Sequence, residues 1–318
     1  MKIGIHYFSG CGNSRWVANI VAQKLQQKGH TVSFVHLVGQ PRLGEEKPDV
    51  EFFISPVYFF GLPSNVVCSI NEMPAVADTK SVLLVVDGGM SGTARRYGRY
   101  LLEGRGYDVL ATHQIVMPDT FLGLSISQLD KEQFDKDLKS ADEQIENALM
   151  TLDNPMPVVV ENWFSFGLSC LIYFPFLWFF RKCLGLSLVS TKNCVSCGKC
   201  AASCPVQNIQ MKDGRPVWNK NCCLCFRCVN HCPVSAIDLS KYALLFGLVG
   251  AFAVWMTMMV VSSSLGSVLS FLLKTAGFIV GFYLGCFLFQ KKYANYPFEK
   301  GLFFAGKKRF KFFDEEKS

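Results

Sequence analysis

The first half of the chain alternates short apolar runs with amphipathic segments. Runs typical of β-strands cover residues 2–7, 32–37, 50–55, 82–86 and 108–116. The segments 14–28, 93–103 and 128–149 instead place apolar residues on one face at helical spacing. A continuous apolar strand suits a sheet that is buried on both faces. The alternation therefore predicts an α/β domain over residues 1–150, with a doubly wound parallel sheet between two helical layers.

The second half of the chain contains longer apolar segments. Residues 242–289 form a zone of 48 residues, interrupted by the sequence SSSLGS. A membrane-spanning helix needs about 20 residues, so this zone predicts a transmembrane helical hairpin at residues 241–290. Lys241 before the zone, and Lys291 with Lys292 after it, place both ends in the cytoplasm under the positive-inside rule. The alternative is a helical hairpin buried within a soluble protein.

An uncharged run at residues 163–180 is the third apolar segment and lies in a linker that covers residues 151–190. Pro175 lies within this run, and Arg181 and Lys182 follow it. If the run crossed the membrane, the parts of the chain before and after it would face opposite compartments. We therefore expect an interfacial or re-entrant segment, with a true span as the alternative.

Composition and charge narrow the class of protein. The 318 residues are 50% hydrophobic and 18% charged, which excludes a disordered or fibrous protein. Residues 1–150 carry 14 Lys/Arg against 17 Asp/Glu, whereas residues 151–318 carry 18 against 8. Because the basic half is also the apolar half, we expect it to meet an anionic membrane surface rather than nucleic acid. Residues 291–318 predict a basic, aromatic cytoplasmic tail at the lipid headgroups, with a solvated tail as the alternative.

Cysteine usage points to redox or metal chemistry. The chain has 14 cysteines, and 9 of them lie between Cys194 and Cys232. The opening sequence MKIGIHYFSG lacks the apolar core of a secretory signal, so we expect a reducing compartment. In such a compartment clustered cysteines bind metal or carry out redox chemistry rather than form disulfides.

The clustered cysteines follow one spacing twice. The pattern Cys-x2-Cys-x2-Cys-x3-Cys-Pro starts at Cys194 and again at Cys222, 28 residues later. It resembles the pattern of bacterial two-cluster ferredoxins, in which the fourth cysteine of each run binds the other cluster. The resemblance implies a small α+β ferredoxin domain at residues 191–240 with two [4Fe–4S] clusters. One cluster would be bound by Cys194, Cys197, Cys200 and Cys232, and the other by Cys222, Cys225, Cys228 and Cys204. Structural zinc sites are the alternative.

Glycine-bearing loops follow three of the predicted strands. They are YFSGCGNS at residues 7–14, PVYFFGLP at 56–63 and DGGM at 87–90. Glycines let the backbone curl around a phosphate, and the N-terminus of the following helix attracts the anion. The first loop is neither a Walker loop nor a dinucleotide fingerprint, and an ordinary glycine turn is the alternative. Three such loops at the carboxyl ends of parallel strands predict a ligand crevice at the topological switch point.

These loops, with the sequence MPDTF at 117–121, resemble a flavodoxin-type FMN domain. Their fusion to the cysteine repeat resembles the flavodoxin–ferredoxin fusion proteins of anaerobic microbes, over residues 1–150 and 190–240. In that family the first loop holds the FMN phosphate, and the other two flank the isoalloxazine ring. The resemblance implies a phosphate site at Ser9, Gly10, Cys11, Gly12, Asn13 and Ser14, and a ring near Pro56, Tyr58, Phe59, Gly88 and Gly89. Cys11 departs from the family pattern, which usually has threonine at this position.

The sequence thus predicts a membrane-associated protein that relays electrons between two [4Fe–4S] clusters and FMN, with its redox domains facing the cytoplasm. An FMN-dependent reductase of a small organic or quinone substrate, fed by the clusters, is the alternative, and a membrane-bound redox sensor is a further one. The expected partners are a redox protein and membrane lipid. No catalytic triad, paired-carboxylate motif or nicotinamide fingerprint is visible, so the sequence identifies neither a substrate nor an oligomeric state.

Overall fold

The computed structural model describes residues 1–38, 47–118, 131–152, 163–261, 267–293 and 298. These residues form two compact units, the first within residues 1–174 and the second within residues 175–298. The first unit is built on a five-stranded sheet, and the second contains two sheets of two strands each.

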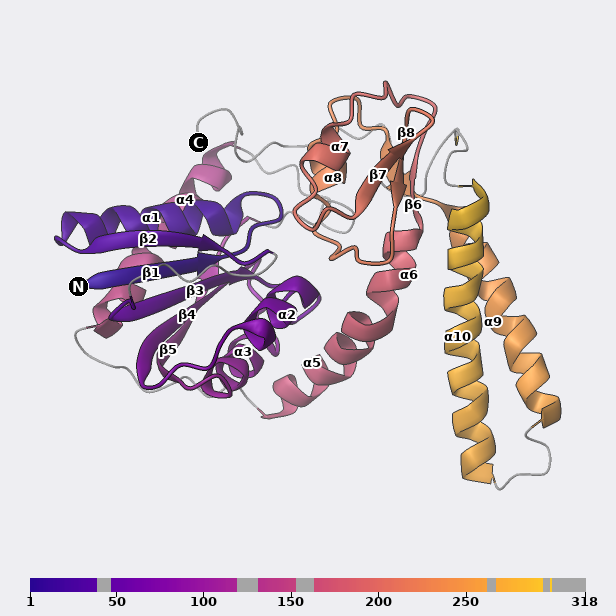
Figure 1. Cartoon of the computed structure of the whole chain (residues 1–318), viewed down its shortest axis with the longest axis horizontal. Coiled ribbons are helices and arrows are strands. Elements are labelled where there is room, and N and C mark those ends of the chain that lie inside the picture. Colours follow the sequence, from indigo (N-terminus) through magenta and orange to yellow (C-terminus); the bar gives the residue numbers. More distant parts are fainter. Residues whose placement is uncertain (39–46, 119–130, 153–162, 262–266, 294–297, 299–318) are drawn as a thin grey trace. The chain divides into compact units, whose positions relative to one another are not determined.

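Five parallel strands form the centre of the first unit (Figure 1). They are β1 (Lys2–Tyr7), β2 (Thr31–His36), β3 (Val50–Pro56), β4 (Thr79–Asp87) and β5 (Tyr107–Val116). Their order is β2-β1-β3-β4-β5, and each neighbouring pair is parallel. This is the flavodoxin-like order, in which the strand order reverses between β1 and β3. The predicted doubly wound α/β domain is therefore confirmed.

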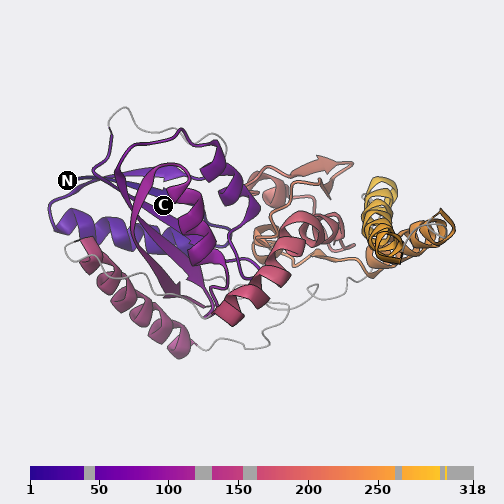
Figure 2. The ribbon, with the colours of Figure 1, turned by 90° about the horizontal axis from the view of Figure 1, so that it is seen from below.

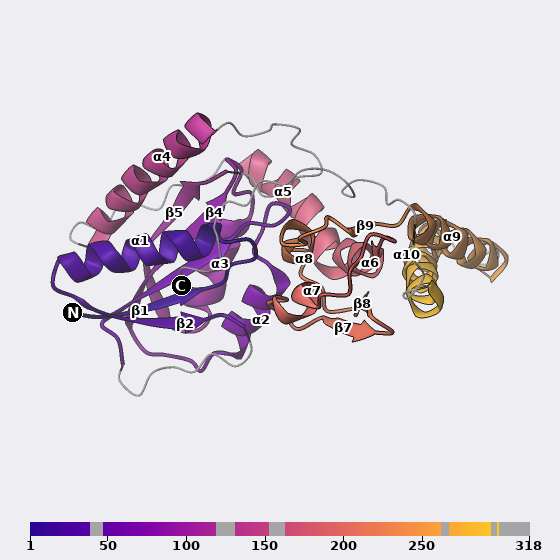
Figure 3. The ribbon, with the colours of Figure 1, turned by 90° about the horizontal axis from the view of Figure 1, so that it is seen from above.

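Helices cover both faces of this sheet. Helices α1 (Asn13–Gln27) and α4 (Lys131–Leu149) pack on one face, and α2 (Ser64–Glu72) and α3 (Ala94–Glu103) lie on the other (Figure 1, Figure 3). Helix α1 buries Val17, Val21 and Leu25 because their spacing places them on one side of the helix. Helix α2 is an addition to the predicted helices, since its 9 residues give only a short periodic signal.

A buried polar network lies within the sheet. Glu51 on β3 accepts a hydrogen bond from the Tyr107 hydroxyl at 2.8 Å, and its Oε2 lies 2.9 Å from His6 Nε2. All three side chains are buried. Burial and the nearby Glu51 carboxylate raise the pKa of Tyr107, so its hydroxyl stays protonated and donates to Glu51. The carboxyl group of Glu51 is tolerated inside the sheet because Tyr107 and His6 both interact with it.

The apolar run at 163–180 is part of a longer helical stretch. Helix α5 (Trp163–Pro175), a π-helical turn (Phe176–Phe180) and α6 (Arg181–Leu186) follow one another without a break. Proline removes a helical hydrogen bond, and the π-turn directly after Pro175 is a known way to accommodate such a loss. Tyr173 of α5 is fully buried and donates to Leu62 O at 2.7 Å, which fastens α5 to the segment between β3 and α2.

The second unit contains an internal repeat. Its elements are β6 (Leu188–Ser190), α7 (Lys199–Ala202), β7 (Ile209–Lys212), β8 (Arg215–Trp218), α8 (Arg227–Asn230) and β9 (Ile237–Leu239). Strand β6 pairs with β9 and β7 pairs with β8, both antiparallel. Helix α8 and strand β9 begin 28 residues after α7 and β7. The duplicated sequence therefore forms a duplicated structure.

Two long apolar helices complete the second unit. Helices α9 (Lys241–Val261) and α10 (Ser267–Tyr293) lie side by side (Figure 1, Figure 2). Their backbones touch at Gly250 and Gly281, where neither position leaves room for a Cβ atom. Glycine recurs at every fourth position of α10 through Gly277, Gly281 and Gly285, a spacing typical of packed transmembrane helices.

Three helical stretches among the described residues are long and apolar enough to cross a membrane. They are Phe164–Leu186, Lys241–Met259 and Leu269–Tyr293. The last two coincide with the predicted hairpin. The first includes the run for which an interfacial or re-entrant position is expected.

Candidate functional site

The first glycine-bearing loop joins β1 to α1 and contains an unsatisfied hydroxyl. Gly12 has a φ of 117°, which favours glycine, and its N–H donates to Ser9 Oγ at 3.1 Å. The Asn13 side-chain amide donates to Pro118 O at 2.8 Å and so connects this loop with the end of β5. Ser14 Oγ is buried and has no hydrogen-bond partner within the described parts of the chain. A donor in this position, at the start of a helix, suits an anion.

The second loop is a tight turn with two phenylalanines at its tip. Tyr58 and Gly61 exchange backbone hydrogen bonds of 2.8 and 3.2 Å. Between them, Phe59 and Phe60 have φ values of 48° and 67°. This conformation is rare for bulky residues and costs about 1–3 kcal/mol at each. Such strain persists only where the surrounding structure holds it, and it is concentrated at ligand sites.

Two distant segments hold this strained turn in place. Phe60 O accepts hydrogen bonds from the Thr93 N–H at 2.6 Å and from Thr93 Oγ1 at 2.9 Å. On the other side, the Tyr173 ring lies against Gly61 and its hydroxyl donates to Leu62 O. Thr93 and Tyr173 lie 33 and 111 residues along the chain from the carbonyls that they bind. No local pattern in the sequence marks either residue as a support of this loop.

The third loop follows β4 and is open to solvent. Asp87 Oδ1 accepts hydrogen bonds from the Gly89 N–H at 2.7 Å and from Gln114 Nε2 at 2.8 Å. Burial raises the pKa of Asp87 above its ordinary value, and these hydrogen bonds oppose the shift. Gly88 and Gly89 are exposed, and no described atom lies near the position that a Cβ of Gly89 would take. The backbone here is therefore accessible to a ligand.

All three loops leave the carboxyl ends of adjacent strands. Strand β1 pairs with β3, and β3 pairs with β4, so the loops lie along one edge of the sheet. The rings of Phe8 and Tyr58 meet edge-on at 6.5 Å and bring the first two loops into contact. The edge between β1 and β3 is where ligands bind in this sheet order.

The structure brings together the residues predicted to bind a cofactor. The loops contain Ser9, Gly10, Cys11, Gly12, Tyr58, Phe59, Gly88 and Gly89, while Asn13 and Ser14 begin α1 and Pro56 ends β3. Residues 119–121 of the MPDTF sequence lie outside the described residues. Trp16 packs against the hydrophobic core of the first unit.

The cysteine-bearing loops of the second unit repeat in backbone conformation as well as in sequence. Positive φ angles recur in pairs at Ser196 and Leu224 (55° and 56°), Gly198 and Phe226 (71° and 55°), and Gln207 and Ser235 (48° and 49°). The members of each pair are 28 residues apart. All but one of these residues carry a side chain and accept an unfavourable conformation. The backbone geometry of the two cysteine-bearing loops is therefore duplicated along with their sequence.

Motif cysteines of the two runs influence one another's pKa. Burial, together with the neighbouring thiols of Cys194, Cys197 and Cys232, raises the pKa of Cys200 to about 11. Burial likewise raises the pKa of Cys228, with contributions from the thiols of Cys222, Cys225 and Cys204. Cys232 of the second run thus lies near cysteines of the first run, and Cys204 of the first run lies near cysteines of the second.

Backbone N–H groups donate to sulfur in both repeats. The Asn208 N–H donates to Cys204 Sγ at 3.3 Å, and at the equivalent position the Ala236 N–H donates to Cys232 Sγ at 3.2 Å. Such donors stabilise thiolate charge and tune the potential of a sulfur-ligated cluster. No set of three or more His, Cys, Asp or Glu side chains within the described segments is arranged to hold a metal ion.

One neighbour of Cys228 was not expected from the sequence. Trp218 on β8 is 1% exposed and partly offsets the rise in the pKa of Cys228 that burial causes, and its indole Nε1 has no hydrogen-bond partner within the described parts of the chain. The sequence around it, RPVW, reads as part of a short strand and carries no motif. Only the tertiary fold brings this side chain near the cysteine.

Comparison with solved structures finds similar proteins over the first half of the chain. A flavodoxin of Streptococcus pneumoniae TIGR4 is 15% identical over 47% of this chain and 99% of its own, with a TM-score of 0.33. A Megasphaera elsdenii flavodoxin is 18% identical over 46% of this chain and 98% of its own, with a TM-score of 0.29. The azoreductase AzrA is 12% identical over 46% of this chain and 98% of its own, with a TM-score of 0.34. No protein-family model and no curated protein matches the sequence.

Proposed function

We propose that this chain is a membrane-associated electron-transfer protein that holds FMN in its first unit and two [4Fe–4S] clusters in its second. The observation that carries the proposal is the repeated Cys-x2-Cys-x2-Cys-x3-Cys-Pro spacing, in loops whose backbone conformation repeats after 28 residues. Three thiolates from one run and a fourth from the other are the ligands of each cluster in two-cluster ferredoxins.

The cysteine spacing favours a cluster over a single zinc ion, because a zinc ion needs four ligands and has no need of the third cysteine and the Cys-x3-Cys-Pro ending in each run. Cys194, Cys197, Cys200 and Cys232 would bind one cluster, and Cys222, Cys225, Cys228 and Cys204 the other. The N–H donors to Cys204 and Cys232 supply the hydrogen bonds that such sulfurs accept.

The three loops of the first unit fit FMN. The unsatisfied Ser14 hydroxyl and the curled backbone around Gly12 would bind the phosphate. Phe59 at the strained tip of the second loop and the exposed Gly88–Gly89 backbone would flank the ring. Cys11 places a thiol where a hydroxyl is usual, so Ser9 and Ser14 supply the hydroxyl donors of this loop. FMN accepts one or two electrons and each cluster carries one, which allows single-electron deliveries to be paired.

The apolar helices support membrane association. Leu248, Val249 and Phe252 on α9 are each more than half exposed, which suits lipid contact and not water. The lysines at both ends of the hairpin favour a cytoplasmic position for both ends. On α5, Phe164, Leu168 and Leu171 form an exposed apolar stripe, whereas Tyr173 is buried against the β3–α2 segment. This two-faced arrangement supports an interfacial position for α5.

The test is cofactor analysis of the full chain, purified anaerobically in mild detergent. We expect about eight iron atoms and one FMN per chain, with interacting [4Fe–4S] signals in electron paramagnetic resonance during stepwise reduction. Cys197→Ser should lower the iron content and slow electron transfer to the flavin. Cys68→Ser, an exposed cysteine outside both groups, is the matched control and should change neither. Full iron content in Cys197→Ser would refute the cluster assignment.

A reductase is the second candidate function, and the open third loop favours it. Gly88 and Gly89 are exposed, and the neighbouring Met90 is 69% exposed, so a small substrate has access to this side of the crevice. Saturable oxidation of the reduced flavin by one organic acceptor would support a reductase. Equal oxidation by unrelated one-electron acceptors would support the relay.

A further inference from the structure

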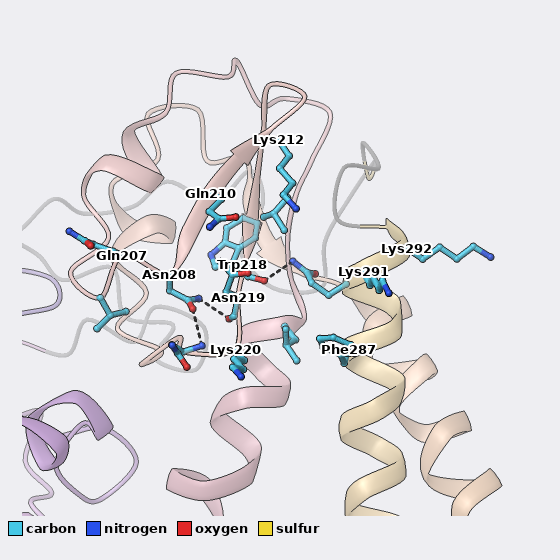
Figure 4. A pocket seen from close by; sticks show the side chains of 15 residues that line it. Gln207, Asn208, Gln210, Lys212, Trp218, Asn219, Lys220, Phe287, Lys291 and Lys292 are labelled. Carbon is cyan, nitrogen blue, oxygen red and sulfur yellow. Dashed lines mark hydrogen bonds between the residues drawn. The ribbon is translucent and has the colours of Figure 1, made fainter. Parts of the chain in front are cut away.

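The second unit contains a pocket of about 780 Å³ where the cysteine repeat meets the end of α10 (Figure 4). Strands β7 and β8 and the segments 206–208 and 219–221 form one side. Leu186 of α6 and the residues Phe287, Gln290, Lys291 and Lys292 of α10 form the other. The pocket therefore lies between the two sulfur-bearing repeats and a helix long enough to cross a membrane.

The lining of this pocket is cationic and rich in hydrogen-bond donors. It includes Lys212, Lys220, Lys291 and Lys292, and no acidic residue is among its lining residues. Six side-chain amides, such as that of Gln210, add neutral donors and acceptors. Ammonium and amide N–H groups donate hydrogen bonds to carbonyl oxygens and to oxygens that gain negative charge. The aromatic rings of Trp218 and Phe287 provide apolar surface beside these donors.

One of the lining residues contacts a motif sulfur, because the Asn208 N–H donates to Cys204 Sγ at 3.3 Å. Trp218, whose indole Nε1 has no hydrogen-bond partner within the described parts of the chain, lies near Cys228. The Asn208 side chain is itself fixed, because it donates to Asn219 O and accepts from the Asn221 N–H, both at 2.8 Å (Figure 4). An occupant of the pocket would therefore lie against the residues that surround the second cluster.

The same pocket is bounded by the polar end of a membrane helix. Gln290 of α10 is buried, and its side-chain amide lies 3.3 Å from Trp218 O (Figure 4). Phe287 lies one turn earlier on α10, and Lys291 and Lys292 follow Gln290 directly. A ligand with a polar headgroup and an apolar tail matches this change from apolar to cationic lining.

We propose that this pocket binds the headgroup of a lipid-soluble quinone, which exchanges electrons with the second cluster. The inference rests on the clusters of the proposed function. A quinone offers two carbonyl oxygens to the lysine and amide donors, a flat ring to Trp218 and Phe287, and a hydrocarbon tail to the bilayer. An anionic lipid headgroup would satisfy the lysines, but it would make no use of the position of the pocket beside Cys204, to whose Sγ the Asn208 N–H donates.

Electron exchange between the clusters and a quinone is balanced in electrons and protons. Reduction of a quinone to its quinol converts two C=O groups to C–OH and consumes two electrons and two protons. The reduced clusters supply the electrons one at a time, each being oxidised by one electron, and water supplies the protons through the exposed lysines. The lysines stabilise the negative charge that oxygen carries before each proton arrives. The reverse reaction, with quinol as the electron donor, balances equally.

Photolabelling tests the location of the site. The full chain, purified anaerobically with its iron and sulfide content measured, is irradiated with a short-chain azidoquinone, and the label is mapped by mass spectrometry. We expect label on peptides that contain residues 206–221 and 287–292. Excess unlabelled duroquinone should prevent this labelling, and phosphatidylglycerol should not.

Paired lysine variants test the contribution of the lining. Lys212→Gln with Lys220→Gln should slow oxidation of the reduced clusters by duroquinone about tenfold, because charged hydrogen-bond donors are lost. Lys192→Gln with Lys199→Gln removes the same charge from the same unit outside the pocket and should leave the rate unchanged. Oxidation by hexaammineruthenium(III), which needs no binding pocket, should be equal in all variants.

Two results would overturn the inference. Label outside the pocket would show that quinone binds elsewhere, and competition by phosphatidylglycerol would show that the pocket is a lipid site. Absence of iron and sulfide would instead refute the proposed function. The two failures are therefore distinguishable in one preparation.

Discussion

Tyr173 connects helix α5 to the strained second loop, and its substitution tests how that loop is held. The side chain is fully buried, its hydroxyl donates to Leu62 O at 2.7 Å, and its ring lies against Gly61. Tyr97 packs against the same ring, with 6.0 Å between centroids. Tyr173→Ala removes both the ring and the hydroxyl, whereas Tyr173→Phe removes the hydroxyl alone.

The two variants should differ in size of effect. Truncation of a fully buried aromatic residue costs about 3–5 kcal/mol, because a cavity replaces the ring. Loss of one hydrogen bond costs about 1 kcal/mol. We therefore expect Tyr173→Ala to lower the free energy of unfolding of the first unit by about 3–5 kcal/mol, and Tyr173→Phe to lower it by about 1 kcal/mol.

The assay is urea unfolding of the full chain in mild detergent, monitored by proteolysis of the first unit. Hydrogen–deuterium exchange over residues 57–72 reports on the second loop directly and should speed up most in Tyr173→Ala. Tyr100→Phe is the matched control, since this tyrosine is 70% exposed, and it should stay within about 0.5 kcal/mol of the parent protein. If Tyr173→Ala leaves both the unfolding midpoint and the exchange unchanged, α5 does not support the loop.

Three further predictions concern the hairpin, the sheet and pH. Gly281→Leu should separate α9 from α10 and increase proteolysis of the detergent-solubilised hairpin, because no side chain fits between the two helices at this position. Gly167→Ala, at an open helical position, should leave proteolysis of the hairpin unchanged. Glu51→Ala leaves two buried polar partners unpaired and should lower the free energy of unfolding by about 3–5 kcal/mol in urea titrations, and a neutral effect would refute the buried network. Burial raises the pKa of Asp87 in the folded protein above its ordinary value of 3.8, so the folded state binds this proton more tightly than the unfolded state. The resulting stabilisation is complete below pH 3.8 and is lost as the pH rises through the raised pKa. Asp87→Asn should therefore gain stability relative to the parent protein as pH rises across this window, and urea midpoints that change in parallel with pH would contradict this.

The sequence predicted the architecture of the first unit because its signals are local. Strand β3 is a continuous apolar run, and α1 repeats apolar residues at helical spacing, so each is recognisable within a few residues. The short α2 was not predicted, and the helix that begins at α5 runs on to Leu186 past a proline that usually ends helices. In both cases tertiary packing outweighs the local signal.

The candidate sites show the same division. By itself the sequence determined which residues lie at the strand ends and which cysteines repeat, because spacing along the chain is enough to show both. Only the tertiary structure decided that Tyr173 supports the second loop and that α10 closes a pocket beside the cysteine repeat. Each of these contacts joins segments that are far apart in sequence. Periodicity describes how one element is formed, whereas the meeting of two side chains depends on how whole elements pack.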